Sequence, residues 1–294
     1  MTLTTQPTDQ NIRAPQPVPS APMEYQFEKL DQASALISQA LRDSALRESA
    51  LRESLRGDAA AGHSLAECDL SVVIPVYNEP KTVLEIVDRV RRLAISKQII
   101  VVNDGSTDGT AKALVALERF KDVTVVHHPV NAGKGAALQT GFRLATGKFV
   151  IVQDADLEYD PSDILAVIEP LQSGLADVAY GSRYLADGCQ DPSRLHRFGN
   201  WVLTELSNLL TGYRLTDMET CYKAFRRELL SQIEIEQKRF GFEPEITAKL
   251  ARRGVQIVEV PVRYASRSWD EGKKIGVRDL ISTLFCIVRY NWRS

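Results

Sequence analysis

The stretch from Phe149 to Pro161 constrains the fold of this chain more than any other. Its first residues, Phe149–Val152, are apolar and long enough for one buried strand, and alternating carboxylates follow almost at once. Pro161, which suits the first turn of a helix, ends this acidic cluster. In open α/β sheets ligands bind beyond the carboxyl ends of the strands, and two Asp side chains one residue apart can hold a hard cation. The stretch predicts either a metal-binding sheet edge or an acidic polar turn.

Strand-like and helix-like segments alternate on both sides of this stretch. Apolar runs begin at Leu70 and occur at Ile99–Val102, Val123–Val126 and Asp177–Tyr180, and helical periodicity returns after most of them. Such alternation predicts an α/β fold with a mainly parallel central sheet flanked by helices and joined by right-handed crossovers. The polar loops after successive strands then gather along one edge of the sheet.

Those loops carry polar and charged side chains suited to a ligand. They include Pro75, Tyr77 and Glu79 after the first strand, Asp104 after the second, Lys134 after the third, and Asp154, Ala155, Asp156 and Glu158 after the fourth. Two familiar phosphate-binding patterns fit poorly. Neither the Gly-x-Gly-x-x-Gly fingerprint after the first strand nor a complete Gly-x-x-x-x-Gly-Lys-Ser/Thr loop is present.

Composition excludes several other classes of protein. The chain has 294 residues and a formal net charge of −2, so charge gives no indication of nucleic-acid binding. Its four cysteines are isolated in the sequence, which is typical of a reducing compartment. The sequence has no secretory leader and no apolar run of about 18 residues, so we expect a cytoplasmic protein without a membrane span of its own.

Three regions are predicted along the chain. Residues 1–65 form a disordered tail, and a five-residue repeat near its end indicates a marginal solvated helix rather than a coiled coil. Residues 66–274 form the main domain. Residues 275–294 form an amphipathic helix with basic flanks, which either lies on an anionic membrane surface or packs on the domain.

At this point the sequence resembles family 2 glycosyltransferases. Within that family it is most similar to the polyprenyl-phosphate (dolichyl-phosphate) mannose and glucose synthases. The resemblance covers about residues 68–275. The motifs that carry it are Ser71–Glu79, Val102–Thr110, Asn131–Gly135, Asp154–Asp156, Gly181–Arg183, Thr216–Lys223, Arg239–Glu245 and Glu259–Val262.

The resemblance implies a nucleotide-sugar-binding fold of the GT-A type and a metal-dependent, inverting hexosyl transfer from a UDP- or GDP-sugar. Pro75, Tyr77, Glu79 and Asp104 would hold the nucleoside. Asp154 and Asp156 would hold Mg²⁺ or Mn²⁺ on the diphosphate, with Glu158 as third ligand where relatives often carry Gln. Lys134 would charge the nucleotide side of the cleft, or it is an ordinary surface lysine.

The implied acceptor is a polyprenyl phosphate, whose anionic oxygen needs positioning more than it needs a general base. Arg183 matches a family arginine near the phosphates and, with Asp156 and Asp217, is a candidate catalytic residue. Asp217 and Glu219 either line the sugar site or cap a loop. Weaker candidates for the acceptor phosphate, each more typical of an ordinary exposed cation, are Arg197, Arg267 and Lys273.

Three functions therefore stay open. The first is a polyprenyl-phosphate glycosyltransferase that contacts the cytoplasmic face of a membrane peripherally. The second is a related enzyme acting on a small soluble or saccharide hydroxyl. The third is a catalytically silent nucleotide-sugar-binding protein, against which the intact Asp154-Ala155-Asp156 motif argues. The base and sugar of the donor and the oligomeric state are not determined by sequence.

Overall fold

The computed structural model describes residues 68–185, 193–239, 241–266 and 277–292. The chain divides into two units, Met1–Leu65 and Ala66–Ser294, and the second contains all of the described residues. The tail and marginal helix predicted for residues 1–65 lie outside them and stay predictions.

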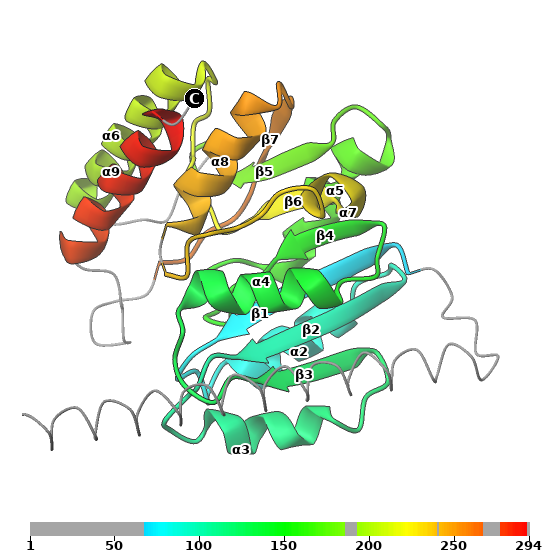
Figure 1. The fold of residues 1–294 in the computed structure, drawn as a ribbon. Coiled ribbons are helices and arrows are strands. Elements are labelled where there is room, and N and C mark those ends of the chain that lie inside the picture. Colours follow the sequence, from blue (N-terminus) through cyan, green and yellow to red (C-terminus); the bar gives the residue numbers. More distant parts are fainter. Residues whose placement is uncertain (1–67, 186–192, 240, 267–276, 293–294) are drawn as a thin grey trace, which may run out of the picture. The chain divides into compact units, whose positions relative to one another are not determined.

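A single sheet of seven strands forms the centre of the described unit (Figure 1), and its order is β3-β2-β1-β4-β6-β5-β7. The strands are β1 (Leu70–Val76), β2 (Lys97–Asn103), β3 (Val123–His127), β4 (Phe149–Val152), β5 (Val178–Ser182), β6 (Lys223–Arg226) and β7 (Ile257–Pro261). All pairings are parallel except those of β6, which is antiparallel to both β4 and β5. The predicted α/β fold with a mainly parallel sheet is confirmed.

Helices cover both faces of this sheet, which explains why its inner strands are almost wholly apolar. The helical elements are α2 (Val83–Arg91), α3 (Thr110–Leu114), η1 (Val115–Leu117), α4 (Lys134–Leu144), η2 (Pro161–Asp163), α5 (Ile164–Gln172), α6 (Arg194–Thr211), α7 (Arg227–Leu230), α8 (Phe242–Arg252) and α9 (Val277–Trp292). Helix α4 packs closely on β1, because a Cβ at Gly141 would lie only 2.2 Å from Val73 Cγ1. Figure 1 shows α4 in front of the sheet and α2 behind it.

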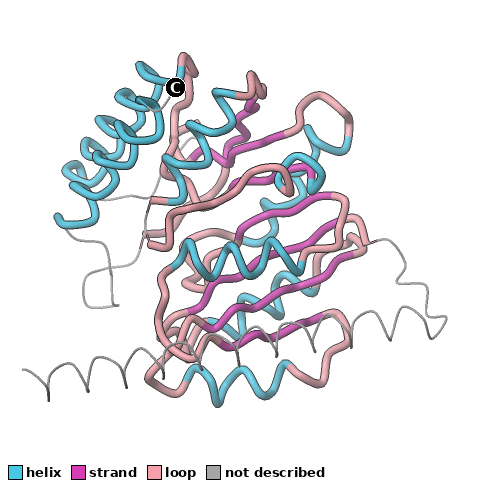
Figure 2. Tube along the Cα trace, in the orientation of Figure 1, coloured by secondary structure: helices cyan, strands magenta, loops and turns pink. Residues whose placement is uncertain are grey.

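The antiparallel strand β6 determines which residues reach the active edge. It lies between β4 and β5, with Ala224 opposite both Ile151 and Ala179. Because β6 runs against its neighbours, its first residue lies near their carboxyl ends. The segment Asp217–Tyr222, which precedes β6, therefore enters the edge where the loops of the parallel strands gather (Figure 2).

Helices α6, α8 and α9 form a group at the β5–β7 end of the sheet (Figure 1). The helix predicted within residues 275–294 is present as α9, and it buries Thr283, Cys286, Ile287 and Tyr290. It therefore packs on the domain, yet it also leaves a second apolar stripe exposed. Within the described residues, the helices are too short or too polar to cross a membrane.

Candidate active site

Hydrogen bonds from backbone N–H groups to side-chain oxygens connect the loops after β1 and β2. Asn78 N donates to Ser106 Oγ over 3.0 Å, and Thr107 N donates to Asn78 Oδ1 over 2.9 Å. Glu79 N donates to Thr110 Oγ1 over 2.9 Å. Asn78 has a φ of 55°, a left-handed conformation that Asn tolerates better than most residues. These bonds fix the backbone that carries the predicted nucleoside-binding side chains.

Of the residues predicted to hold the nucleoside after β1, Pro75 is within the strand, and Tyr77 and Glu79 lie in the turn that follows it. All three are partly exposed at the carboxyl edge of the sheet. Their placement agrees with the predicted edge, and direct contact with a nucleoside stays a prediction.

Asp104 is 2% exposed and its carboxylate holds the loop before α4. His128 Nδ1 lies 2.7 Å from Asp104 Oδ1, Ala132 N donates to the same oxygen, and Gly133 N donates to Oδ2 over 2.7 Å. Burial alone would raise the pKa of Asp104, but these hydrogen bonds hold it below its usual value. The described contacts thus give Asp104 a role in shaping the loop, and its predicted contact with a nucleoside is not shown.

Lys134, the first residue of α4, is an internal cation. Its Nζ lies 3.0 Å from Asp154 Oδ1 and 3.2 Å from Glu243 Oε1, and its side chain is only 17% exposed. Burial acts to lower the pKa of Lys134, but the two carboxylates hold it well above its usual value. The alternative of an ordinary surface lysine is therefore wrong. Lys134 joins the acidic loop after β4 to the start of α8.

The acidic loop after β4 turns sharply at Leu157. This residue has a φ of 64°, which is unusual for a bulky side chain and is found most often where a site constrains the backbone. Glu158 N closes the turn by donating to Asp156 Oδ1 over 3.2 Å. Asp154 and Asp156 are both partly exposed, whereas Ala155 is 3% exposed within the core. The side chain of Ala155 packs inward, and its place among the nucleotide-sugar-binding residues stays a prediction.

The predicted metal set of Asp154, Asp156 and Glu158 is not assembled. Across the part of the chain that the structure describes, no three His, Cys, Asp or Glu side chains lie together as a metal site. Tyr264 Oη donates to Glu158 Oε2 over 2.8 Å, and Ala265 N donates to the Glu158 carbonyl, so this residue is tied to the segment after β7. Two hard carboxylates remain, and this donor set fits a Mg²⁺ or Mn²⁺ that takes its other ligands from a diphosphate and water.

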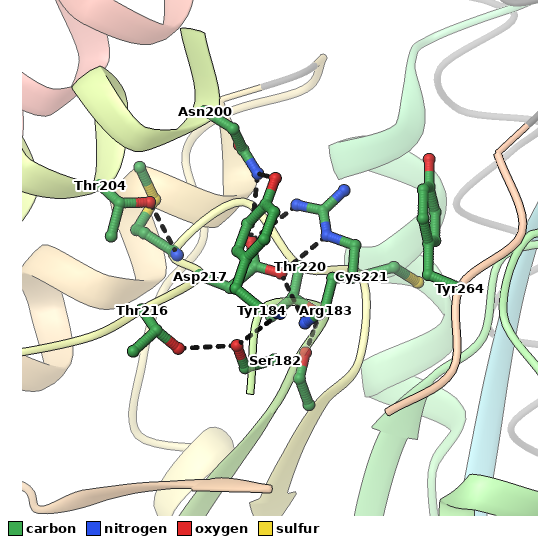
Figure 3. A network of polar contacts seen from close by, with 12 residues as sticks. Ser182, Arg183, Tyr184, Asn200, Thr204, Thr216, Asp217, Thr220, Cys221 and Tyr264 are labelled. Carbon is green, nitrogen blue, oxygen red and sulfur yellow. Dashed lines mark hydrogen bonds and ion pairs between the residues drawn. The ribbon is translucent and has the colours of Figure 1, made fainter. Parts of the chain in front are cut away.

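At the end of β5, Arg183 forms a buried pair with Asp217 (Figure 3). Arg183 Nε and Nη2 each donate to one carboxylate oxygen of Asp217 over 2.7 Å, and Arg183 N donates to Oδ2 over 3.1 Å. Their side chains are 7% and 0% exposed. Burial acts to lower the pKa of Arg183, but Asp217 holds it well above its usual value. Among the described residues, Arg183 Nη1 has no hydrogen-bond partner.

Side chains of helix α6 also hold this pair in place. Asn200 Nδ2 donates to Asp217 Oδ1 over 3.3 Å and to Tyr184 Oη over 2.7 Å. Thr204 Oγ1, one turn further along α6, accepts from Met218 N over 3.2 Å. The inner face of α6 therefore positions the loop that carries Asp217 (Figure 3).

The structure brings most of the predicted residues together as two half-sites. We call Asp104, Lys134, Asp154 and Asp156 the amino-terminal half-site. Arg183, Tyr184, Asn200 and Asp217 form the carboxyl-terminal half-site. Of the weaker phosphate candidates, Arg197 has an exposed side chain on α6 with no described ion pair, and Arg267 and Lys273 lie outside the described residues.

Sequence reasoning missed Asn200 of the carboxyl-terminal half-site and three residues that contact the half-sites, namely Glu243, His128 and Tyr264. Glu243 and Glu245 both stand in the motif Arg239–Glu245. Glu245 is 0% exposed and accepts hydrogen bonds from Glu236 N and Gln237 N. It therefore anchors the loop before α8.

Comparisons with known proteins agree with this geometry. Residues 71–234 match the model of glycosyl transferase family 2, and the chain belongs to that family. It is 33% identical over 222 residues to the polyprenol monophosphomannose synthase of Mycolicibacterium smegmatis, covering 70% of this chain and 80% of the relative. It is 32% identical over 212 residues to the undecaprenyl-phosphate mannosyltransferase of Micrococcus luteus, covering 69% of this chain and 86% of the relative.

Solved structures show the same fold. Glucosyl-3-phosphoglycerate synthase from Mycobacterium tuberculosis with Mg²⁺ and UDP has a TM-score of 0.60 at 21% identity, covering 77% of this chain and 80% of the other. The same enzyme with Mn²⁺, UDP and glucosyl-3-phosphoglycerate has a TM-score of 0.59 at 20% identity, covering 77% and 81%. The predicted GT-A-type fold is confirmed.

Proposed function

We propose that this glycosyltransferase moves a hexose, with inversion, from a UDP- or GDP-sugar to a polyprenyl-type phosphate, with Mg²⁺ or Mn²⁺ as cofactor. The relatives named above act on polyprenyl phosphates, which supports this acceptor. The structural neighbour binds UDP with Mg²⁺ or Mn²⁺, which supports a metal-assisted donor site.

The amino-terminal half-site would hold the donor diphosphate. Asp154 and Asp156 would hold the cation, which supplies a Lewis acid for the leaving diphosphate. Lys134 keeps Asp154 in place and offsets part of the local negative charge. The hydrogen bonds of Asn78 and Asp104 with backbone N–H and side-chain groups keep the surrounding loops in one arrangement. Binding of the donor therefore costs little loop entropy.

Asp217 and Glu243 are both held in ion pairs, which favours a phosphate acceptor over a hydroxyl acceptor. This observation carries the proposal. A hydroxyl acceptor needs a general base, and a carboxylate that is already held in an ion pair is less free to accept a proton. Asp217 is paired with Arg183, and Glu243 is paired with Lys134. A phosphate acceptor is already ionised and needs a fixed cation, which Arg183 provides through Nη1.

An exposed apolar face on α6 and α9 suits an acceptor that lies in a membrane. The two helices pack side by side (Figure 1), and Phe198, Trp201, Ile281 and Phe285 are each more than half exposed. Exposed apolar side chains of this size, with Arg197 close by on α6, are typical of helices that lie in an anionic membrane interface. We propose that this face contacts the membrane peripherally.

The test is a transfer assay with labelled UDP-glucose or GDP-mannose, Mg²⁺ and a polyprenyl phosphate. We expect an organic-soluble labelled product with one of these donors. Parallel reactions with 3-phosphoglycerate and with a simple saccharide test the second function. A product in either parallel reaction, without any lipid product, would contradict the proposed acceptor.

Vesicle sedimentation tests the membrane face separately. The intact chain should sediment with vesicles that contain anionic lipid and much less with neutral ones. Trp201→Ser combined with Phe285→Ser should lower the bound fraction at least tenfold, because each side chain loses roughly 1.5–3 kcal/mol of burial. Leu195→Ser combined with Val115→Ser, in which Val115 lies away on η1, is a control that changes the α6–α9 face at one position only.

A further inference from the structure

Glu219 is a partly buried carboxyl group that neither half-site uses. It lies in the segment before β6, two residues after Asp217. Its Oε1 atom is fully buried and has no hydrogen-bond partner among the described residues. Buried polar atoms in native proteins are nearly always paired, so an orphaned oxygen at a substrate site indicates a missing ligand group.

Titratable groups from several elements act electrostatically on Glu219. They are Glu243 on α8, Lys223 at the start of β6, Arg183 after β5, Asp217 in the preceding loop and Cys286 on α9. The two cations are already engaged. Arg183 is paired with Asp217, and Lys223 Nζ donates to the carbonyls of Met218 and Thr220 over 2.7 and 2.6 Å. Neither is hydrogen-bonded to Glu219.

This environment favours the neutral form of Glu219. Burial raises the pKa of its carboxyl group, and the carboxylate of Glu243 raises it further, whereas Lys223 and Arg183 act in the opposite direction. The outcome is a pKa of about 8. At neutral pH, Glu219 therefore offers one hydroxyl donor and one carbonyl acceptor.

The position of Glu219 indicates which part of a substrate it would meet. Glu243, which acts electrostatically on Glu219, is paired with Lys134 of the amino-terminal half-site, and Arg183 and Asp217, which also act on it, belong to the carboxyl-terminal half-site. In the proposed reaction, the sugar lies between the leaving diphosphate on one side and the attacking phosphate on the other. A neutral carboxyl group between the two half-sites is complementary to a sugar hydroxyl, with which it can both donate and accept.

We propose that Glu219 is a specificity-determining residue that binds a hydroxyl group of the donor sugar. This inference rests on the proposed function, since it assumes that the donor is a nucleotide sugar. It assigns Glu219 neither to the metal nor to the nucleoside. Its contribution should therefore appear only when the sugar is attached to the nucleotide.

Calorimetry with Mg²⁺ at pH 7 tests this directly. The intact protein is titrated with UDP, UDP-glucose, GDP and GDP-mannose, and the nucleotide sugar that binds is used in the comparison. We expect Glu219→Ala to weaken binding of that nucleotide sugar about tenfold and to change binding of its nucleoside diphosphate less than twofold. Glu219→Gln, which keeps a donor and an acceptor, should stay within threefold for both ligands.

The pH profile gives a second readout that a merely structural residue would not change. Affinity of the wild-type protein for the nucleotide sugar should fall as pH rises through about 8, because the carboxyl group then loses its proton. Glu219→Gln should show no such fall. If Glu219→Ala does not fold, the profile of Glu219→Gln still decides the matter. A fall that persists in Glu219→Gln would assign the titration to Lys223 and overturn the proposal.

The other outcomes separate this inference from the proposed function. Nucleotide-sugar binding in the wild type that is unchanged in Glu219→Ala would overturn the role of Glu219 and leave the proposed function intact. Equal weakening of nucleotide sugar and nucleoside diphosphate would also overturn it, since the defect would then be structural. A wild-type protein that binds none of the four ligands would overturn both proposals together.

Discussion

In the amino-terminal half-site, Asp104 and Asp156 accept hydrogen bonds from backbone N–H groups, whereas in the carboxyl-terminal half-site the charged side chains mainly bind each other. Asp104 accepts from two backbone N–H groups and from His128. Arg183 and Asp217 form a side-chain pair braced by Asn200. The first arrangement fixes loops and leaves Asp154 and Asp156 partly exposed for a ligand. The second arrangement fixes the guanidinium group of Arg183 through Nε and Nη2.

The largest effect is expected from breaking the pair in the carboxyl-terminal half-site. Asp217→Ala leaves the Arg183 cation buried without a counter-ion, which should lower the free energy of unfolding by about 3–5 kcal/mol and abolish transfer. Urea unfolding and the transfer assay measure the two effects. The double variant Arg183→Met with Asp217→Leu should regain most of the stability, because an apolar pair replaces the ions, but no activity. Restored activity in it would refute a functional role for the pair.

A smaller effect is expected from the loop anchor of the amino-terminal half-site. Asp104→Asn removes a charged acceptor and should lower the free energy of unfolding by about 2 kcal/mol at pH 7. The pKa of Asp104 is lowered in the folded state, so its contribution is complete above the ordinary value of 3.8 and is lost as pH falls through the lower, folded-state value. Unfolding measured from pH 7 to pH 3 should show the two proteins converging in acid. A constant difference would contradict this account.

Lys134 tests whether the amino-terminal half-site serves the donor alone. Lys134→Met should weaken donor binding about tenfold, or about 1.4 kcal/mol, because Asp154 loses its positioning cation. The KM for the acceptor should stay within twofold. Two-substrate kinetics measure both quantities, with Lys112→Met on α3 as a control lysine in the same half of the sheet. An equal rise in both KM values would mean that the half-sites are not separate.

The smallest effect concerns Glu158, whose Oε2 accepts a hydrogen bond from Tyr264. Glu158→Gln should change the Mg²⁺ concentration for half-maximal activity by less than twofold, whereas Asp156→Ala should remove activity. Tyr264→Phe should cost about 1 kcal/mol of stability through the lost hydrogen bond. A tenfold rise in the Mg²⁺ requirement of Glu158→Gln would restore Glu158 as a ligand.

The same contrast explains how much the sequence could predict. The strands that begin at Leu70 and Phe149 and the loops that follow them are local patterns, so the amino-terminal half-site could be located. The inward side chain of Ala155 and the hydrogen bond between Glu158 and Tyr264 could not be read from those patterns. The carboxyl-terminal half-site depends on β6, a four-residue antiparallel strand with no distinctive periodicity. The pairing of Arg183 with Asp217, 34 residues away in the chain, could not be derived from spacing. Family resemblance found both residues but did not indicate that they are partners.

The burial of individual charged side chains was the other property that could not be predicted from the sequence. A lysine between two glycines is usually exposed, yet Lys134 is enclosed by Asp154 and Glu243. Glu243 lies far from Lys134 in the sequence. Gly135 allows this, because a Cβ there would lie 2.1 Å from the carbonyl oxygen of Gln237. The close approach of the loop before α8 to α4 is a tertiary fact that neither segment reveals alone.

The central claim is that donor and acceptor phosphates are bound by different half-sites, and Arg183→Lys tests it most directly. Lysine keeps the charge but cannot form the two-nitrogen pair with Asp217 while presenting a third nitrogen to a ligand. With a polyprenyl phosphate as acceptor, we predict that its KM rises at least tenfold while calorimetric donor affinity changes less than twofold. An equal loss of donor affinity would contradict the account.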